Sequence, residues 1–184
     1  MACLTCKLSR DILRTTSCGY SLPEVKDIYL ANFNDVKTTA GTDTSETGCT
    51  GEVITTMTDA TGGTSPKFYH IEPSKNSVSF TDELVVDDTN GNKYRTHTLT
   101  FSLANKYDSC LHNDFDALSL GRYFAVVVTA DGNWLALGRL TGLEASAATL
   151  AGGQDQNGIT VTLSANVAES AIPLSASVIE IVKG

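Results

Sequence analysis

Apolar and polar residues alternate most regularly between residues 76 and 104, and this pattern predicts a long β-hairpin. The two alternating runs are separated by Asn90-Gly91. Asn-Gly is typical of a two-residue type I′ turn, because both central positions of that turn need a positive φ angle. We therefore expect the chain to reverse direction at these two residues.

A turn at that position also predicts the register, with Asp88 opposite Lys93 and Leu84 opposite His97. Because side chains alternate between the faces of a strand, a slip of one residue would invert both faces at once. One face is apolar at its base and charged near the tip, and its apolar members are Val78, Phe80, Leu99, Phe101 and Leu103. The other face carries Ser77, Ser79, Thr81, Glu83, Val85, Asp87, Tyr94, Thr96, Thr98, Thr100 and Ser102.

This second face consists mostly of hydroxyl groups with a few carboxylates, and it contains no His or Cys. Such a surface is wettable, weakly acidic and chemically inert. One interpretation is the solvent side of a half-buried antiparallel sheet. The other is a lining past which something anionic must slide.

The pattern along the rest of the chain predicts short strands joined by turns, with one helix. The helix is expected over residues 105–120, with Leu111, Phe115 and Leu118 facing the sheet and Gly121 ending it. Segment 37–51 is either a long loop or a weak edge strand, and segment 142–158 is an exposed excursion or hairpin end. Further strands are expected at 25–33, 52–58, 67–72, 122–130, 134–140, 159–167 and 177–182.

These elements predict a mainly β fold, an antiparallel β-sandwich or barrel with one flanking α-helix and the long hairpin. The 184 residues are 41% hydrophobic and 18% charged, which suits one compact domain. We assign residues 1–21 to an N-terminal arm and residues 22–184 to that domain.

Charge argues against a protein that reads nucleic-acid sequence. The net charge is −8, the pI is about 4.7, and Lys and Arg form no cluster. An acidic surface repels phosphate, which would suit a channel that must not retain DNA. Residues 1–15 lack the pattern of a secretory signal, and no apolar run approaches about 18 residues, so we expect cytoplasmic synthesis and no membrane contact.

Candidate chemistry is sparse, and we predict no catalytic residue, metal or cofactor. Cys3, Cys6 and Cys18 resemble part of a zinc site, but no second pair completes it, so free thiols are expected. The hairpin acids are divided between two faces, and the Gly-rich pieces lack a P-loop pattern. His97 is expected to serve in packing or at an interface rather than as a base.

The order of these segments resembles the small tail-tube-like virion proteins of tailed phages, particularly phages of gut Bacteroidetes. The resemblance covers residues 22–182. The phrases that carry it are Val-Lys-Asp-Ile-Tyr-Leu-Ala-Asn-Phe (25–33), Phe-Tyr-His-Ile-Glu-Pro (68–73), Ser-Val-Ser-Phe-Thr-Asp-Glu (77–83), Leu-Thr-Phe-Ser-Leu (99–103), the strand at 122–130, and Trp-Leu-Ala-Leu-Gly-Arg (134–139) after an Asp-Gly-Asn turn.

The resemblance implies homo-oligomeric rings, commonly hexameric, that stack into a tube in the virion tail after assembly in the host cytoplasm. The partners would be other copies, further tail or neck proteins, and DNA in transit without sequence-specific binding. The expected lumen-lining residues are Ser79, Thr81, Glu83, Asp87, Thr96, Thr98 and Thr100. The expected subunit-interface residues are Asp88, Asn90, Gly91, Lys93, Arg95 and His97.

Three other classes remain open alternatives: a head–tail adaptor or ring protein, a capsid decoration protein, and an acidic binding domain on the host side. Stacking into long tubes would separate a tube protein from an adaptor ring. A decoration protein would instead bind a capsid lattice.

Overall fold

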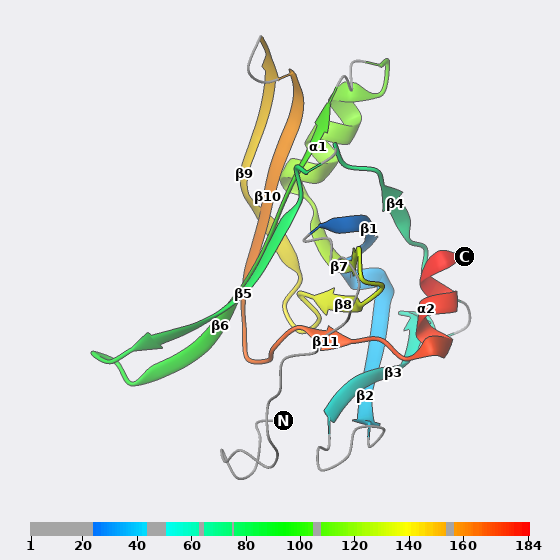
Figure 1. The fold of residues 1–184 in the computed structure, drawn as a ribbon, viewed down its shortest axis with the longest axis vertical. Coiled ribbons are helices and arrows are strands. Elements are labelled where there is room, and N and C mark those ends of the chain that lie inside the picture. The colour runs from blue at the N-terminus through cyan, green and yellow to red at the C-terminus, as the bar shows by residue number, and fades with distance from the viewer. Residues whose placement is uncertain (1–23, 44–50, 63–64, 75, 105–107, 154–156) are drawn as a thin grey trace, which may run out of the picture.

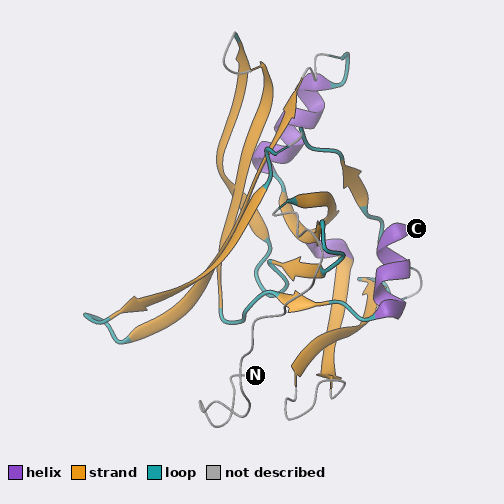
Figure 2. Ribbon diagram, in the orientation of Figure 1, coloured by secondary structure: helices purple, strands orange, loops and turns teal. Residues whose placement is uncertain are grey.

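The computed structural model describes residues 24–43, 51–62, 65–74, 76–104, 108–153 and 157–184, and within them the mainly β, antiparallel prediction is confirmed. Figure 2 shows strands through most of the molecule, and the two α-helices lie well apart. The elements are β1 Val25–Asn32, η1 Phe33–Asp35, β2 Val36–Asp43, β3 Gly51–Asp59, β4 Tyr69–Ile71, β5 Ser79–Asp87, β6 Asn92–Ala104, α1 Leu111–Leu120, β7 Arg122–Thr129, β8 Trp134–Leu137, β9 Leu143–Gly152, β10 Asn157–Val167, β11 Ile172–Pro173 and α2 Ala176–Lys183.

Nine of these strands form one strongly bent sheet that does not close into a barrel. Its first part, in the order β9-β10-β6-β5, makes an outer layer (Figure 1). Its second part, β4-β1-β7-β8-β11, makes a middle layer. The two parts join where β9 pairs with β7 at Arg122–Glu144 and Tyr123–Leu143. Strands β2 and β3 form a separate two-stranded sheet.

The main core lies between the outer and middle layers and is also covered by α1. The apolar stripe predicted for this helix is confirmed, since Leu118, Leu111 and Phe115 all pack into this core. From the two layers, the fully buried members include Ile28, Leu99, Phe101, Val127, Val161 and Leu163. Burying this much apolar side-chain surface is the main term that stabilises the sandwich.

Strand β7 is buried on both faces, which explains its continuous apolar sequence from Tyr123 to Val128. Its second face contributes Phe124 and Val126 to another core, beneath α2 and the β2–β3 sheet. Helix α2 places Val178 and Val182, one turn apart, against that face. The strand predicted at 177–182 is therefore wrong, because this β-branched run is helical.

The long hairpin is present, but its predicted register is wrong by two residues. Asp82, not Leu84, lies opposite His97, and Val86 rather than Asp88 lies opposite Lys93. The cause is the turn, which contains the four residues between Asp87 and Asn92. The side chain of Asp87 accepts hydrogen bonds from the backbone N–H groups of Thr89 (3.0 Å) and Asn90 (3.3 Å), which stabilises the longer turn. A shift of two keeps every side chain on its predicted face.

Other boundaries also differ from the prediction. Helix α1 begins at Leu111, later than expected, and residues 105–107 lie outside the described residues. Most of segment 142–158 is the long strand β9, paired with β10. Segment 37–51 contains β2, an edge strand paired with β3, and its residues 44–50 are not described. The proposed arm at 1–21 also lies outside the described residues.

Candidate functional site

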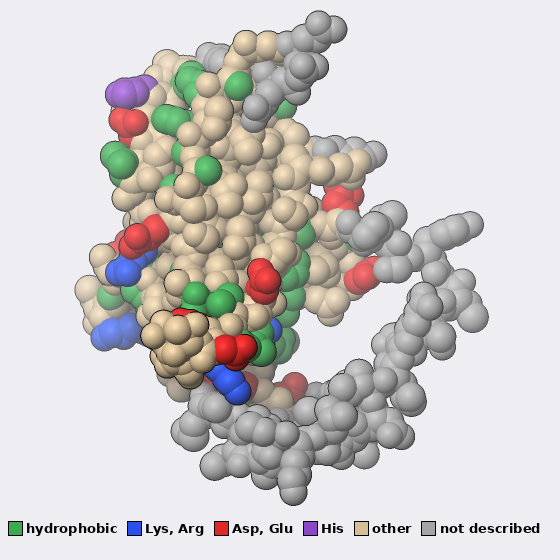
Figure 3. All heavy atoms as spheres, turned by 90° about the vertical axis from the view of Figure 1, so that its left-hand side faces the viewer, with side chains coloured by type: hydrophobic (Ala, Val, Ile, Leu, Met, Phe, Trp, Pro, Cys, Tyr) green, Lys and Arg blue, Asp and Glu red, His purple; other side chains and the backbone are tan. Residues whose placement is uncertain are grey.

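The strand pairing assembles a broad polar surface on the outer face of the β9-β10-β6-β5 layer. Cross-strand pairs align its hydroxyl groups in rows: Ser79 is opposite Thr100, which is opposite Thr162, and Thr98 is opposite Ser164. Their neighbours along β6 point to the opposite side, where Leu99 and Phe101 are buried. Figure 3 shows much of this side of the molecule as a broad area with few charged side chains. We call the surface the hydroxyl face.

The hydroxyl groups on this face bond to one another across the strands. The Oγ1 atoms of Thr100 and Thr162 are 3.1 Å apart, and Ser102 Oγ lies 2.8 Å from Thr160 Oγ1. At the lower end, Thr96 Oγ1 donates to Asn166 Oδ1 at 3.0 Å. Because these groups use part of their hydrogen-bonding capacity within the sheet, they offer less of it to a passing ligand.

The charges on the hydroxyl face are acidic. Glu83 of β5 and Glu144 of β9 share this face, and Glu144 Oε1 lies 2.9 Å from Arg122 Nε of β7. Within the four described strands, the basic residues Lys93 and Arg95 of β6 alternate to the opposite face. These four strands thus present no cation to phosphate on this side, and Arg122 at the border with β7 is paired with Glu144.

All seven predicted lining residues lie on the hydroxyl face of β5 and β6. Asp87 has an additional local role, because hydrogen bonds from the turn, above all from Asn90, lower the pKa of its carboxyl group. Sequence reasoning missed that β10 and β9 double the width of the face. The alternation of β10 is visible in the sequence, whereas β9 is rich in Ala and has no clear period. The added residues are Glu144, Thr149, Thr160, Thr162, Ser164 and Asn166.

The tip of the hairpin projects away from the body (Figure 1). Asp88, Asn90, Gly91 and Lys93, which were predicted at a subunit interface, are exposed there. The structure adds an apolar feature on the side of the hairpin that faces away from the hydroxyl face. Leu84 and Val86 are 56% and 47% exposed.

The outer layer has two edges that are largely open within the described residues. Strand β5 pairs only with β6, and β9 pairs with β7 only at its first two residues. Exposed edges are templates for pairing with another chain. Each edge also has an exposed apolar residue on the side opposite the hydroxyl face: Leu84 on β5 and the 45% exposed Leu150 on β9, which lies opposite the buried Ile159.

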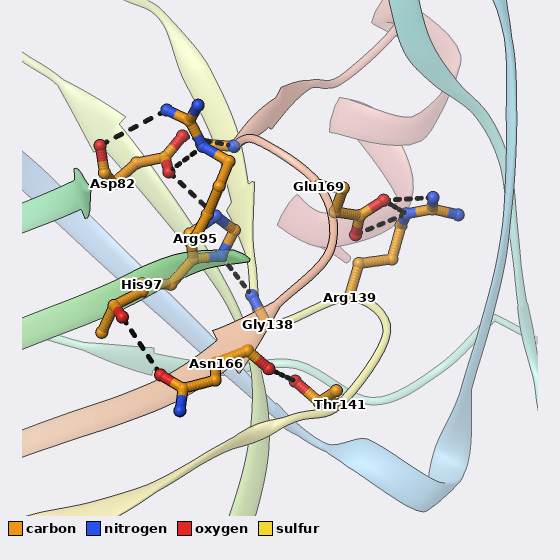
Figure 4. A network of polar contacts seen from close by, with 10 residues as sticks. Asp82, Arg95, His97, Gly138, Arg139, Thr141, Asn166 and Glu169 are labelled. Atoms are coloured by element: carbon orange, nitrogen blue, oxygen red, sulfur yellow. Dashed lines mark hydrogen bonds and ion pairs between the residues drawn. The ribbon is translucent and has the colours of Figure 1, made fainter. Parts of the chain in front are cut away.

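A polar network holds the root of the hairpin to the body (Figure 4). Asp82 Oδ1 accepts a 2.6 Å hydrogen bond from Arg95 Nε, and Asp82 Oδ2 accepts one of 2.9 Å from the backbone N–H of Ala171. His97 Nδ1 accepts from the Gly138 N–H at 3.1 Å. Packing is the role that the structure shows for His97, because its side chain is only 1% exposed. A side chain this buried offers no surface for the subunit interface that was also expected.

A second ion pair lies beside this root. Arg139, after β8, forms a two-pronged pair with Glu169, which follows β10, and Arg139 Nε lies 3.0 Å from both carboxylate oxygens. The side chains are 14% and 8% exposed. Such paired, nearly buried charges favour a fixed geometry. The network therefore connects the hairpin to the β8–β9 and β10–β11 connections.

Burial and the neighbouring polar groups shift the pKa values of His97 and Asp82 in opposite directions. Burial, the largest influence, lowers the pKa of His97, although the carboxylates of Asp82 and Glu169 oppose it. For Asp82, burial would raise the pKa, but hydrogen bonds from Arg95 and Ala171 outweigh it and the pKa is lowered. At neutral pH the network thus contains a neutral imidazole beside an ionised carboxylate.

The other two histidines lie elsewhere, each beside one carboxylate: His70 Nε2 is 2.9 Å from Asp27, and His112 Nε2 is 3.3 Å from Asp116. Among the described residues, no three His, Cys, Asp or Glu side chains gather as a metal site would require. The Cys3, Cys6 and Cys18 group lies outside them, and Cys110 is exposed. No helix in the described part of the chain is long and apolar enough to cross a membrane.

Comparison of the chain with protein-family models, with curated proteins and with solved structures finds no match.

Proposed function

We propose that this protein is a non-catalytic structural subunit that assembles head to tail into rings, and that the rings stack into the tail tube of a phage virion. The observation that carries the proposal is the outer layer: four antiparallel strands with one hydroxyl face and two open edges. The resemblance of the segment order to tail-tube-like proteins supports the same role.

The topology favours edge-to-edge joining of identical copies. Each strand of the outer layer is antiparallel to the next, so β5 and β9 at its two edges run in opposite directions. In a head-to-tail ring, β5 of one copy would therefore meet β9 of the next as an antiparallel pair. Such pairing would satisfy the open backbone groups of both edges and remove the hazard of uncontrolled association.

The two sides of the joined edges would also match in chemistry. Matching faces would bring the hydroxyl face of one copy into line with that of the next, while the exposed Leu84 and Leu150 lie on the opposite side of their edges. Six copies of the four strands, spaced by about 4.8 Å and tilted by about 40°, would close a barrel with a backbone diameter of about 50 Å. Such a barrel is wide enough for a DNA duplex.

The hydroxyl face would then line the channel. Its neutral hydroxyl groups and its few carboxylates would let phosphate pass without capture, since retention of DNA depends on Lys and Arg contacts. The exposed hairpin tip, with Asp88, Asn90, Gly91 and Lys93, would project from the ring toward other copies or tail and neck proteins.

Negative-stain electron microscopy of the purified chain, with light scattering, tests the proposal directly. We expect rings or hollow tubes with a central opening. Rings that never stack would favour the adaptor alternative. Particles without an opening at every concentration, in the presence or absence of tail components, would contradict the proposal.

A further inference from the structure

The root of the hairpin contains a buried imidazole with one nitrogen that lacks a hydrogen bond. Nδ1 of His97 accepts from the Gly138 N–H, whereas Nε2 is buried, has no hydrogen-bond partner and lies 3.5 Å from Asp82 Oδ1. Because an acceptor nitrogen carries no proton, the neutral ring has its hydrogen on Nε2. The protonation state of this ring is therefore coupled to the contact with Gly138.

Protonation would oppose that contact. A second proton on the ring must be added at Nδ1, which would then face the Gly138 N–H donor to donor. Gly138 is buried and held in a left-handed conformation with φ of 69°, and a Cβ there would meet Leu143 at 2.8 Å. Since the turn has little room to rearrange, its N–H would lose its acceptor, which costs about 1–3 kcal/mol for a buried group.

Charged groups from four elements face the ring or its immediate neighbours. Asp82 comes from β5, Arg95 from β6, and Glu169 from the connection after β10, where Arg139 from the β8–β9 connection neutralises it. A protonated His97 would be attracted to Asp82 Oδ1, which Arg95 Nε already holds at 2.6 Å. The imidazolium and Arg95 would thus compete for one oxygen.

We propose that His97 is an acid-sensitive latch: when neutral it fastens the hairpin root to the β8–β9 connection, and when protonated it releases Gly138 and loosens the projecting hairpin. The latch belongs to the isolated chain and does not depend on ring assembly. It would set how firmly the hairpin is held at its angle to the body.

The direction in which the pKa of His97 is shifted agrees with this geometry. Burial lowers the pKa of His97 from its ordinary value, so the latch is closed at neutral pH and opens only on acidification.

Hydrogen–deuterium exchange of the full chain tests the latch. Exchange is followed in peptides from residues 84–95 and 134–142, at pH 7.5 and at pH 5.0, in dilute solution and after correction for the intrinsic effect of pH. We expect exchange in both segments to rise at least about fivefold at the lower pH in the wild type. In His97→Asn, whose Oδ1 atom can replace Nδ1 as the acceptor without titrating, we expect less than about a twofold change.

The matched control is His112→Asn, because His112 is an exposed histidine on α1, and it should respond as the wild type does. An equal response of His97→Asn and the wild type, or no response of the wild type, would overturn the latch. If His97→Asn does not fold, the Gly138 amide is followed by NMR in the wild type. Its proton signal should move with the same midpoint as the His97 ring, and an unchanged signal down to pH 5.0 would overturn the latch.

Discussion

Thr100 and Thr162 lie directly opposite each other on β6 and β10, and 3.1 Å separates their Oγ1 atoms. The pair shows how the outer face remains polar without offering positive charge. The two hydroxyl groups bond to each other, and the strands β5, β6, β9 and β10 carry no basic side chain on this face. A surface of this kind is wetted by water but has no strong attraction for phosphate.

Added cations should convert this face into a DNA-binding surface. In Thr81→Lys/Ser164→Lys, the two lysines flank Thr98 on either side, so they share the face without being directly opposed. We expect the wild type to show no retention of duplex DNA at about 50 mM salt, and the variant to bind with an affinity that falls steeply as salt rises. Fluorescence anisotropy with labelled DNA measures the affinity of each protein and its dependence on salt.

The control for this experiment is Thr81→Gln/Ser164→Gln, which has similar side-chain length and no charge. It should behave as the wild type does. Wild-type binding as strong as that of the lysine variant would contradict the idea of a non-adhesive face.

A glycine at the start of β10 should be required for the pairing that builds the same layer. Gly158 has φ of 124°, and a Cβ there would lie 2.0 Å from the backbone oxygen of Leu103 on β6. We expect Gly158→Ala to reduce the free energy of unfolding by more than about 3 kcal/mol, since both strain and a backbone clash result. Gly132→Ala is the matched control, with φ of 87° and open space, and should cost about 1 kcal/mol. Urea denaturation of both variants measures the difference, and equal losses would contradict the clash.

Stability should depend on pH in two separate ranges because of the hairpin root. A histidine whose pKa is lowered by folding takes up its proton more readily in the unfolded chain, so His97 makes stability fall as pH drops below about 6.5, by at most about 1.4 kcal/mol per pH unit. Asp82, whose pKa is also lowered, adds a further loss as pH falls below about 3.9.

Urea denaturation between pH 8 and pH 3 measures this profile. In His97→Asn, the decline between pH 6.5 and pH 5 should be weaker than in the wild type, while the loss at lower pH remains. An identical decline in both proteins would assign the first range to other groups.

The sequence was sufficient to predict the class of fold and the faces of the hairpin. Those predictions depend on a period of two, and the two-residue register error left them intact. The error itself arose from Asp87, whose side chain stabilises a four-residue turn that Asn90-Gly91 alone does not reveal. Turn length depends on such side-chain contacts as well as on the dipeptide.

Two other elements could not be predicted because packing determines them. Strand β9 is mostly Ala, Ser and Thr and shows no period, so its pairing with β10 is what makes it a strand. Helix α2 has a β-branched run, yet its place beneath β7 buries Val178 and Val182 on one helical face. The polar network at the hairpin root was also missed, because its members are separated by up to 89 positions along the chain.

The head-to-tail contact itself can be tested by mixing two variants. Leu84→Glu places a charge at the β5 edge, and Leu150→Glu places one at the β9 edge. Each change should prevent assembly, because it removes about 1.5–3 kcal/mol of burial from every contact and leaves a desolvated carboxylate. Leu140→Glu, at a residue that is 51% exposed and lies in neither strand, should assemble as the wild type does.

A mixture of the two edge variants should form a dimer of twice the subunit mass and nothing larger. The Leu84→Glu chain keeps an intact β9 edge and the Leu150→Glu chain keeps an intact β5 edge, so one native contact can form between them and both remaining edges are blocked. A two-fold contact between two β5 edges would give a different result: Leu150→Glu would assemble normally and the mixture would form no new species. Light scattering of the mixture therefore distinguishes a contact that can extend into a ring from one that can produce only pairs.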